Sequence, residues 1–503
     1  MPGFVLAIDQ GTTGSTALVV DAQGEIRGRG YATVTQHYPR PGWVEHDPTD
    51  LWESALAAAG QAIEASGVSA HDLVALGITN QRETTMVWER ASGRPVHRAI
   101  VWQCRRSAPI CSALRAAGLD QVFRDRTGLV LDPYFSGTKL KWLLEAQPDL
   151  RGRAQRGELA FGTVDSWLAW NLTGGRAHIT DASNASRTLL LDLDQVAWDR
   201  DLLALLGVPG EMLPRVVPSS GVVEECAAAG PIPAGLPIAG IAGDQQAALF
   251  GQGCLSPGLA KNTYGTGCFL LVQAGATRPR PGDGILATIA WRIGDETRYA
   301  LEGSVFVAGA AVQWLRDELG LIATVEESEG LARSVDDTGG VVVVPAFVGL
   351  GAPHWQPAAR GTIVGLTRGS SRAHLVRAVL ESIAHQVADV LEAVVSGSGI
   401  ELKELRADGG AAANDFLMQF QADLLGVPVA RAAVLETTAA GAAYLAGLGV
   451  GLWKSAEEVA ATRRPAHVFA PAATPDQRCR WRMAWQRAVA CAHRWAEEAP
   501  AEE

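Results

Sequence analysis

The first group of residues that could do chemistry is a turn near the N-terminus, Asp9-Gln10-Gly11-Thr12-Thr13-Gly14-Ser15. Gly11 and Gly14 let the backbone approach an anion closely, and the hydroxyl groups of the turn can donate hydrogen bonds to phosphate oxygens. Asp9 ends an apolar run, where a carboxylate can hold a hydrated magnesium ion. The turn is not a P-loop, which needs GxxxxGK[ST] before a helix. An ordinary hairpin turn is the alternative.

Two further glycine-rich turns occur later in the chain. Gly265-Thr266-Gly267 lies between predicted strands at 259–263 and 268–272, which repeats the strand–turn–strand pattern of the first turn. Asp408-Gly409-Gly410 follows a predicted strand at 402–407 and precedes a predicted helix, and a helix N-terminus preceded by glycines suits a phosphate or a flat ring. Each turn alone could be structural. Three such turns in one chain favour a nucleotide site.

Two polar segments could act on a second substrate. Asp244-Gln245-Gln246 follows the apolar run 238–242, and a carboxylate at a strand end can serve as a general base. Its alternative role, the N-cap of a helix that begins at Gln245, is compatible with catalysis. Asn80-Gln81-Arg82-Glu83 supplies adjacent donors and acceptors that can bind vicinal hydroxyl groups. A surface ion pair is the alternative for Arg82 and Glu83. The ten histidines show no HExxH spacing.

The elements that position these residues are strands alternating with helices. Apolar runs at 4–8, 16–20 and 74–78 are predicted strands, and Asp47-Pro48 opens a helix that Gly67 ends. This alternation indicates an α/β fold. Ser371 is predicted to cap a long helix. A final helix opens at Thr474-Pro475, with two sets of residues on it. The predicted apolar face is Trp481, Trp485, Ala488, Ala492 and Trp495, and Arg478, Arg480, Arg482 and Arg487 are predicted to be solvated.

The similar hairpins suggest that the chain consists of two similar halves. A length of 503 residues suits roughly two to four domains at ~100–200 residues each. The Pro- and Gly-rich segment 229–243 precedes the second hairpin. We therefore expect an N-terminal domain over 1–250 and a C-terminal domain over 251–503.

The composition excludes several classes of protein. The formal net charge is −11, from 43 basic and 54 acidic residues, which disfavours a nucleic-acid or anionic-membrane binder but not a small anionic ligand. Seven cysteines without a CxxC pair favour buried thiols in a reducing cytosol. Asp9 interrupts the N-terminal apolar run too early for a signal peptide. The uncharged stretch 226–243 contains three prolines and cannot be a membrane helix. We expect a soluble cytoplasmic protein.

Taken together, these motifs resemble the FGGY carbohydrate kinases of the actin-like ATPase superfamily, over essentially the whole chain. The resemblance rests on residues 9–13, 77–85, 242–251, 262–269 and 408–410, on Tyr134-x-Ser136-x-x-Lys139-Leu140-x-Trp142, and on 361–381. The last two segments resemble the two signatures of the family. The Asn-Gln-Arg-Glu and Gly-Asp-Gln-Gln blocks are specific to its glycerol kinase branch.

The resemblance implies two actin-like (ribonuclease H-like) domains, with mixed sheets flanked by helices and an active-site cleft between them. It also implies ATP-dependent phosphorylation of glycerol to sn-glycerol 3-phosphate with Mg²⁺, and a homodimer or homotetramer. Asp244 matches the general base. The glycerol-binding positions are Arg82, Glu83, Trp102, Tyr134, Asp244, Gln245 and Phe269. The nucleotide-binding positions are Thr12, Thr13, Gly14, Thr266, Gly309, Gln313, Gly410 and Asn414. Asp9 and Asp244 match positions that hold magnesium through water.

The sequence departs from the family pattern in two places. Family members usually carry an arginine where this chain has Thr16, and serine is common at the position of Gly14. We therefore expect the γ-phosphate charge to be less well neutralised than in relatives. Segment 226–237 lacks both the basic loop that binds fructose bisphosphate in some relatives and the histidine that the sugar-transport phosphocarrier protein phosphorylates in others. We expect this chain to respond to neither regulator.

Two alternative functions stay open at this point. One is an FGGY kinase for another small polyol or ketose, such as a tetritol or a pentulose. Arg82-Glu83 together with Phe269 favours glycerol instead. The other is a non-catalytic actin-like ATPase, either a filament former or a chaperone module. The intact Asp244 and the absence of a separate peptide-binding domain weigh against it.

Overall fold

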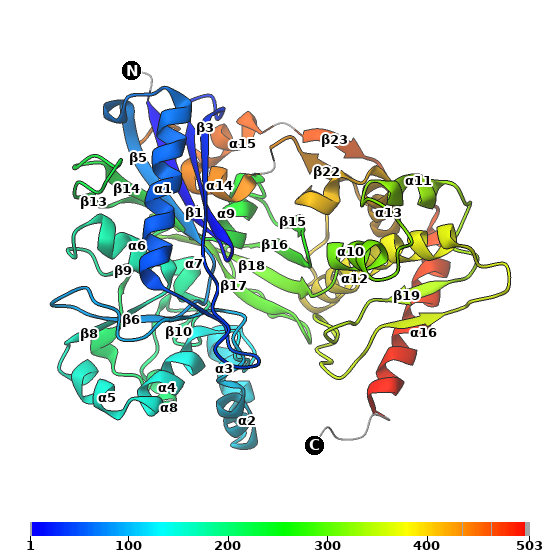
Figure 1. Ribbon diagram of the computed structural model, residues 1–503, viewed down its shortest axis with the longest axis horizontal. Helices are drawn as coiled ribbons and strands as arrows, with labels where there is room; N and C mark the ends of the chain where they lie inside the picture. The colour runs from blue at the N-terminus through cyan, green and yellow to red at the C-terminus, as the bar shows by residue number, and fades with distance from the viewer. Residues whose placement is uncertain (1–2, 435, 464, 498–503) are drawn as a thin grey trace.

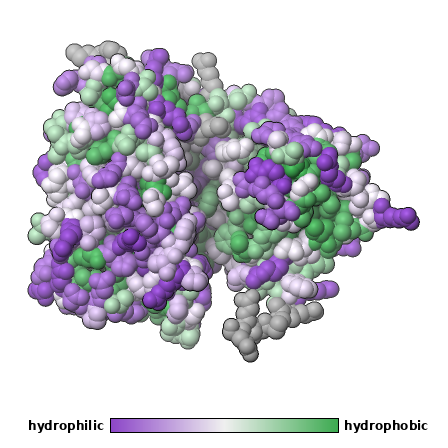
Figure 2. All heavy atoms as spheres, viewed as in Figure 1, coloured by the Kyte–Doolittle hydropathy of each residue, from purple (hydrophilic) through white to green (hydrophobic). Residues whose placement is uncertain are grey.

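The computed structural model describes residues 3–434, 436–463 and 465–497. The chain forms two α/β halves that lie side by side, with the N-terminal strands in one and the long helices of the last third of the chain in the other (Figure 1). A hollow runs between the two halves on the face shown in Figure 2. The predicted α/β class is confirmed.

The sheet of the N-terminal half is mixed. Its strands, in spatial order, are β3 (Ile26–Thr33), β2 (Gly14–Val20), β1 (Phe4–Gln10), β5 (Leu73–Asn80), β14 (Pro237–Gly243) and β13 (Ser220–Glu225). The first three strands are antiparallel to one another, whereas β1, β5 and β14 are parallel. The ends of β1, β5 and β14 therefore deliver Asp9, Arg82 and Asp244 to one edge of the sheet.

The C-terminal half repeats this topology. Its strands are β17 (Leu286–Ile293), β18 (Glu296–Val305), β16 (Cys268–Gly275), β15 (Leu259–Tyr264), β21 (Glu404–Asp408), β22 (Val429–Ala432) and β23 (Pro465–Phe469). The hairpin β15–β16 corresponds to β1–β2, and β15, β21 and β22 are parallel as β1, β5 and β14 are. The two expected sheets join through one parallel pair, Ser220 with Ile293, and so form a single 13-stranded sheet.

Helices cover both faces of the joined sheet. α1 (Pro48–Ser66) packs on β2 and β3 and begins at Asp47, whose side chain accepts a hydrogen bond from the backbone N of Thr49. α12 (Arg372–Ser398) packs on the strands of the C-terminal half and is capped by Ser371. Both helix starts agree with the sequence predictions, because Asp and Ser side chains accept hydrogen bonds from the free N–H groups of a first turn.

Two short helices lie on the opposite face, between the halves. α9 (Asp244–Gly251) packs against α14 (Thr437–Gly449), and α14 also packs on β1, β5 and β14 although it comes late in the chain. The contact brings backbones together, since a Cβ added to Gly441 would lie 1.9 Å from the carbonyl oxygen of Ala247. The apolar residues around these helices come from both halves and form one continuous cluster.

The remaining elements surround this framework. In the N-terminal half they are β4 (Glu45–His46), β6 (Met86–Glu89), β7 (Ala99–Ile100), α2 (Ala108–Ala116), α3 (Asp120–Thr127), α4 (Ser136–Ala146), α5 (Pro148–Gln155), β8 (Leu159–Gly162), α6 (Val164–Leu172), β9 (Ile179–Asp181), α7 (Ala182–Ala185), β10 (Leu191–Asp192), β11 (Ala197–Trp198), α8 (Arg200–Leu206) and β12 (Arg215–Val217). In the C-terminal half they are α10 (Gly309–Asp317), α11 (Glu327–Arg333), β19 (Val342–Val344), β20 (Thr362–Val364), α13 (Asp415–Leu425), α15 (Ala456–Thr462) and α16 (Pro475–Glu497). No helix in the described ranges is long and apolar enough to cross a membrane.

The final helix, α16, corrects part of its prediction. Trp485, Ala488 and Ala492 are buried as expected, but Trp495 is 64% exposed. Arg482, expected to be solvated, is buried and donates hydrogen bonds to Asp389 and Glu392 of α12. Periodicity predicted the helix correctly but could not show that α12 presents two carboxylates to it.

Candidate active site

The two hairpin turns form a matching pair of loops. We define loop 1 as residues 11–13, between β1 and β2, and loop 2 as residues 265–267, between β15 and β16. Each is closed by a backbone hydrogen bond of 2.9 Å, from Gly11 N to Gly14 O and from Gly265 N to Gly267 O. Thr13 and Thr266 are exposed at the loop tips, where their hydroxyl groups can reach a phosphate.

One side chain shows that the loops are close together. The indole N–H of Trp102 donates a hydrogen bond to Thr12 Oγ1 at 2.9 Å, and the Trp102 ring lies 6.3 Å from the Phe269 ring, centroid to centroid. Thr12 belongs to loop 1, and Phe269 follows loop 2. Trp102 also meets Tyr134 edge to face at 5.5 Å. Trp102, Tyr134 and Phe269 therefore form an aromatic wall beside the loops.

The third glycine turn lies beside loop 2. Gly409 has φ +88°, and a Cβ there would lie 2.6 Å from the carbonyl oxygen of Tyr264, so only glycine fits. Gly309, the first residue of α10, donates its N–H to Gly265 O at 2.9 Å, and a Cβ there would approach Ala411 at 3.9 Å. Gly309 and the turn 409–413 thus border the same space. Further along these elements, Gln313 is exposed on α10, and Asn414 caps α13.

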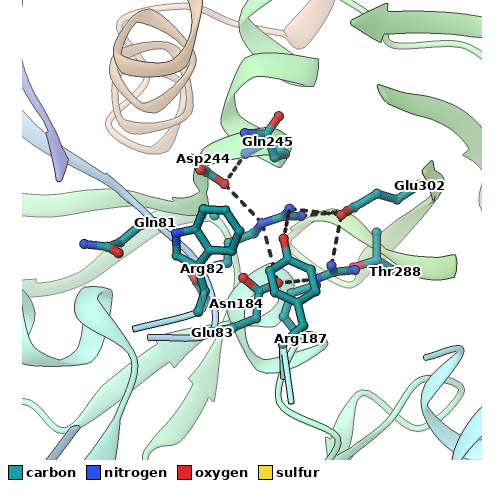
Figure 3. A network of polar contacts seen from close by, with 12 residues as sticks. Gln81, Arg82, Glu83, Asn184, Arg187, Asp244, Gln245, Thr288 and Glu302 are labelled. Atoms are coloured by element: carbon teal, nitrogen blue, oxygen red, sulfur yellow. Dashed lines mark hydrogen bonds and ion pairs between the residues drawn. The ribbon is translucent and has the colours of Figure 1, made fainter. Parts of the chain in front are cut away.

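The predicted substrate residues belong to a buried network of charges (Figure 3). Arg82 forms a two-point contact with Glu302, at 2.7 Å and 3.0 Å, and its Nε lies 3.1 Å from Asp244 Oδ1. It also donates to Gln246 Oε1 at 3.2 Å and to the Tyr134 hydroxyl at 3.4 Å. Four N–H groups of this guanidinium therefore donate hydrogen bonds, and the fifth, at Nε, faces Asp244 as an ion pair.

Sequence reasoning missed two members of this network, Arg187 and Glu302. Arg187 donates to Glu83 Oε1 at 2.7 Å and to Glu302 Oε1 at 2.9 Å, and the side chains of Arg187, Glu302 and Glu83 are at most 1% exposed. Burial opposes ionisation of Glu302, but Arg187 and Arg82 outweigh it and hold its pKa below the ordinary value. The available signal was that Glu302 is the single charge in the stretch 299–305 of β18, because a buried charge needs a partner.

Glu83 is held in an uncommon backbone conformation. Its φ is +60°, in the left-handed region that side chains other than glycine rarely adopt. Its carbonyl oxygen accepts hydrogen bonds from the hydroxyls of Ser136 (3.0 Å) and Thr85 (3.1 Å), which fix this conformation. Burial raises the pKa of the Glu83 carboxyl, opposed by Arg82 and Arg187. Such strain is typical of functional sites.

The predicted amide ligand, Gln245, is oriented by a buried lysine. Nζ of Lys261 contacts Gln245 Oε1 and lies 3.1 Å from Thr263 Oγ1. A lysine ammonium can only donate, so the Gln245 carbonyl faces it and the Gln245 amide N–H groups are left for a ligand. Burial lowers the pKa of Lys261, opposed by the charges of Asp408 and Asp244. Lys261 is a third site residue that sequence reasoning missed.

Asp244 and Asp9 are two carboxylates of the site that have few partners among the described residues. Asp244 begins α9, one residue earlier than expected, and Gly243 rather than Asp244 occupies the cap position. Its side chain is 28% exposed, whereas those of Arg82, Glu83 and Glu302 are at most 2% exposed. Burial, together with the neighbouring charge of Asp244, raises the pKa of Asp9 to about 8.

This pair of carboxylates fits a divalent cation, because a cation near them would offset their mutual repulsion. Within the described ranges, no group of three or more His, Cys, Asp or Glu side chains is arranged to hold a metal ion. A cation at Asp9 and Asp244 would therefore take its other ligands from water and phosphate, as Mg²⁺ commonly does.

Comparisons with known proteins agree with this geometry. Residues 4–251 match the N-terminal domain of the FGGY family of carbohydrate kinases, and residues 260–450 match its C-terminal domain. The chain is 58% identical over 494 residues to the glycerol kinase of Trichlorobacter lovleyi, covering 98% of this chain and 99% of that protein. It is 55% identical over 498 residues to the glycerol kinase of Deinococcus radiodurans, covering 99% of each.

Solved structures give the same result for the fold. The crystal structure of Plasmodium falciparum glycerol kinase with ADP matches with a TM-score of 0.93 at 33% identity and covers 98% of each chain. The gluconate kinase of Lactobacillus acidophilus matches with a TM-score of 0.89 over 99% of each chain, at 20% identity, and so supports the fold alone. The predicted two-half arrangement with a large mixed sheet is confirmed.

Proposed function

Because the chain belongs to the FGGY family of carbohydrate kinases, we propose that it transfers the γ-phosphoryl group of ATP to glycerol, giving sn-glycerol 3-phosphate and ADP. The observation that carries the proposal is the cluster of Arg82, Glu83, Asp244 and Gln245 beside the aromatic wall. Full-length relatives at 54–58% identity are named glycerol kinases. The cluster offers charged and amide groups to three hydroxyls, and the wall suits a short carbon chain.

Glycerol would enter by displacing contacts that the network makes among its own residues. Since every N–H group of Arg82 already faces a polar partner, the substrate must replace the weakest of these contacts. The longest hydrogen bond is the one to Tyr134, at 3.4 Å, and the 3.1 Å contact with Asp244 is an ion pair without a hydrogen bond. Displacing Arg82 from Asp244 would leave this carboxylate facing a substrate hydroxyl. Glu83, held by Arg187, and the free amide of Gln245 would bind the other hydroxyls.

Asp244 is then the general base. It would accept the proton of the terminal hydroxyl as that oxygen attacks the γ-phosphorus, while the bond from γ-phosphorus to the bridging oxygen breaks and ADP leaves. Positioning both substrates in line is the larger part of catalysis for this reaction. Loops 1 and 2 would supply backbone N–H groups and threonine hydroxyls to the phosphates. Mg²⁺, held through water by Asp9 and Asp244, would neutralise phosphate charge.

The proposal divides the chain at the boundary expected from the sequence. Residues 1–250 would carry glycerol and loop 1, and residues 251–503 would carry loop 2 and the adenosine site. Gly309 and Gly410 would border that adenosine site, since Gly309 and the turn 409–413 line the same space, and Gln313 and Asn414 would reach it from further along the same elements. Closure of the two halves would exclude water, which otherwise competes with glycerol for the phosphoryl group.

The proposal extends to the surroundings of the enzyme. It includes an absolute requirement for Mg²⁺, a cytoplasmic location where ATP is available, and assembly into a homodimer or homotetramer. Nucleic acid is not a partner, because the net charge of −11 opposes binding to a polyanionic strand. Metal chelation and size-exclusion chromatography with light scattering test the metal and the assembly separately.

The decisive experiment measures ADP release with and without glycerol, for the wild type and for Asp244→Asn. The wild type is expected to release ADP only with glycerol, and the variant to lose about 10²–10⁴-fold in kcat. Asp295→Asn, whose carboxylate is fully exposed, is the matched control and should behave as wild type. ADP release that is independent of glycerol and unaffected by the Asp244 substitution would refute the mechanism. A panel of polyols and ketoses identifies another substrate if one is preferred.

A further inference from the structure

Tyr31 lies on the edge strand of the sheet, in line with two residues of the phosphate end. In the strand register Asp9 of β1 is opposite Thr16 of β2, and Thr16 is opposite Tyr31 of β3. Residues opposite each other on neighbouring strands project from the same face. Asp9, Thr16 and Tyr31 therefore form one row across three strands.

This row lies on the face of the sheet that carries α9 and α14 rather than on the face that carries α1. Leu18, two residues after Thr16 and so on the same face, packs in the cluster with α9 and α14. Ala17, on the other face, packs in the cluster that contains α1. Tyr31 thus projects from the face that α9 covers, and α9 begins with Asp244.

The phenol of Tyr31 reaches loop 1. A Cβ added to Gly14, the residue that closes loop 1, would lie 2.6 Å from the Tyr31 hydroxyl oxygen and 2.7 Å from its Cζ. The hydroxyl end of Tyr31 therefore rests directly against the bare backbone of Gly14. Any side chain at position 14 would displace it.

The hydroxyl is free to bind a ligand. Tyr31 is 41% exposed, and its backbone N–H bonds to Gln61 Oε1, but its hydroxyl bonds to no residue in the part of the chain that the structure describes. The row itself provides no cation, since its other members are Thr16 and Asp9. A hydrogen-bond donor at loop 1 is therefore left without an acceptor, beside a phosphate site that lacks a positive side chain in this row.

We propose that the Tyr31 hydroxyl donates a hydrogen bond to a phosphoryl oxygen of ATP held at loop 1. The inference rests on the proposed function and adds a nucleotide-binding residue to it. Tyr31 takes up the space over Gly14 and reaches the phosphate as a neutral donor. An O–H donor bonding to a charged phosphate oxygen makes a short, charge-assisted hydrogen bond.

Tyr31→Phe tests the proposal, because it removes only the hydroxyl and keeps the ring packed on Gly14. We expect kcat/KM for ATP to fall about tenfold, the loss typical of a hydrogen bond to a charged group at a partly exposed site. KM for glycerol should stay within about twofold of wild type. Tyr38→Phe is the matched control, since Tyr38 is 67% exposed on the same segment and its hydroxyl donates to Gln36.

Inhibition constants for ADP and adenosine, measured for both variants, separate a phosphate contact from a change in ring packing. Weaker inhibition by ADP with unchanged inhibition by adenosine supports the proposal. A loss confined to ATP also supports it and assigns the contact to the γ-phosphate. Unchanged kcat/KM for ATP in Tyr31→Phe, or an equal loss for adenosine, overturns it. Wild-type protein without glycerol-dependent ADP release refutes the proposed function instead, so the two failures are distinguishable.

Discussion

A Glu302→Gln substitution keeps the shape of the side chain but removes the charge at the centre of the buried network. Glu302 accepts three hydrogen bonds, two from Arg82 and one from Arg187, and its side chain is fully buried. Glutamine can keep the two contacts at Oε1. It places an N–H₂ group where Oε2 now accepts from Arg82 at 2.7 Å. One charged contact is lost. The guanidinium groups of Arg82 and Arg187 then lose the negative charge of Glu302 that they share.

The magnitude follows from these contacts. A hydrogen bond between charged groups contributes about 1.5–3 kcal/mol, which corresponds to about 10- to 100-fold in kcat/KM for glycerol. The loss falls on glycerol because Arg82, less firmly held, would pair more tightly with Asp244 and compete with the substrate. Breaking a buried ion pair also lowers the free energy of unfolding by about 3–5 kcal/mol. KM for ATP should change little, since no hydrogen bond of loop 1 or loop 2 involves Glu302.

The assay is coupled ADP release with either substrate varied at saturation of the other, preceded by a thermal melt to show that the variant is folded. Glu296→Gln is the matched control, because Glu296 lies on the same strand, is 76% exposed and pairs with the surface residue Arg298. A folded Glu302→Gln enzyme with wild-type kcat/KM for glycerol would refute the reasoning. An equal loss for ATP and glycerol would also refute it, since the network would then act on the whole fold rather than on Arg82.

Three further predictions follow from other parts of the molecule. Thr16→Arg places a cation opposite Asp9 and should raise kcat/KM for ATP by up to about tenfold, because a charged donor then contacts phosphate; no change or a loss in steady-state kinetics contradicts this. Micromolar fructose bisphosphate and the phosphorylated phosphocarrier protein should leave turnover unchanged, because segment 226–237 contains no Lys, Arg or His; inhibition by the sugar bisphosphate would disprove the first half. Burial raises the pKa of Glu381 from 4.5 to about 7 despite its contact with Arg377. Above pH 4.5 this carboxyl group ionises in the unfolded chain but stays protonated in the folded protein. The free energy of unfolding should therefore fall by roughly 3 kcal/mol as the pH rises from 4.5 to 7. Glu381→Gln should remove this part of the fall, and thermal melts at pH 5 and 8 that decline equally for both proteins would contradict it.

Local sequence patterns predicted the parts of the site that one segment defines by itself. The glycines of 11–14 and 265–267 mark hairpins because few other residues allow the tight approach, and Asp47 and Ser371 mark helix starts because their side chains bond to free N–H groups. The side chains delivered by the strand ends therefore lie where the pattern suggested. Their assignment to glycerol and ATP stays a prediction.

Contacts between distant segments could not be predicted in this way. Glu302 and Arg82 are 220 residues apart, and Arg187 joins them from a third segment with no recognisable motif. The same holds for Lys261 of β15, which orients Gln245 although nothing in the sequence of β15 indicates this contact. Local patterns carry no information about such pairing, because the partners meet only when the two sheets join.

The position of α14 has a consequence for how the protein forms during synthesis. N-terminal segments often begin to fold while the rest of the chain is still being made. Here the apolar face formed by Val5, Ala7, Ala75 and Ala239 is covered by a helix that ends at Gly449. The core of the N-terminal half is therefore incomplete until the C-terminal half has been translated. During that interval its exposed strands are a surface for chaperones, and a fragment ending near residue 250 should be prone to aggregation.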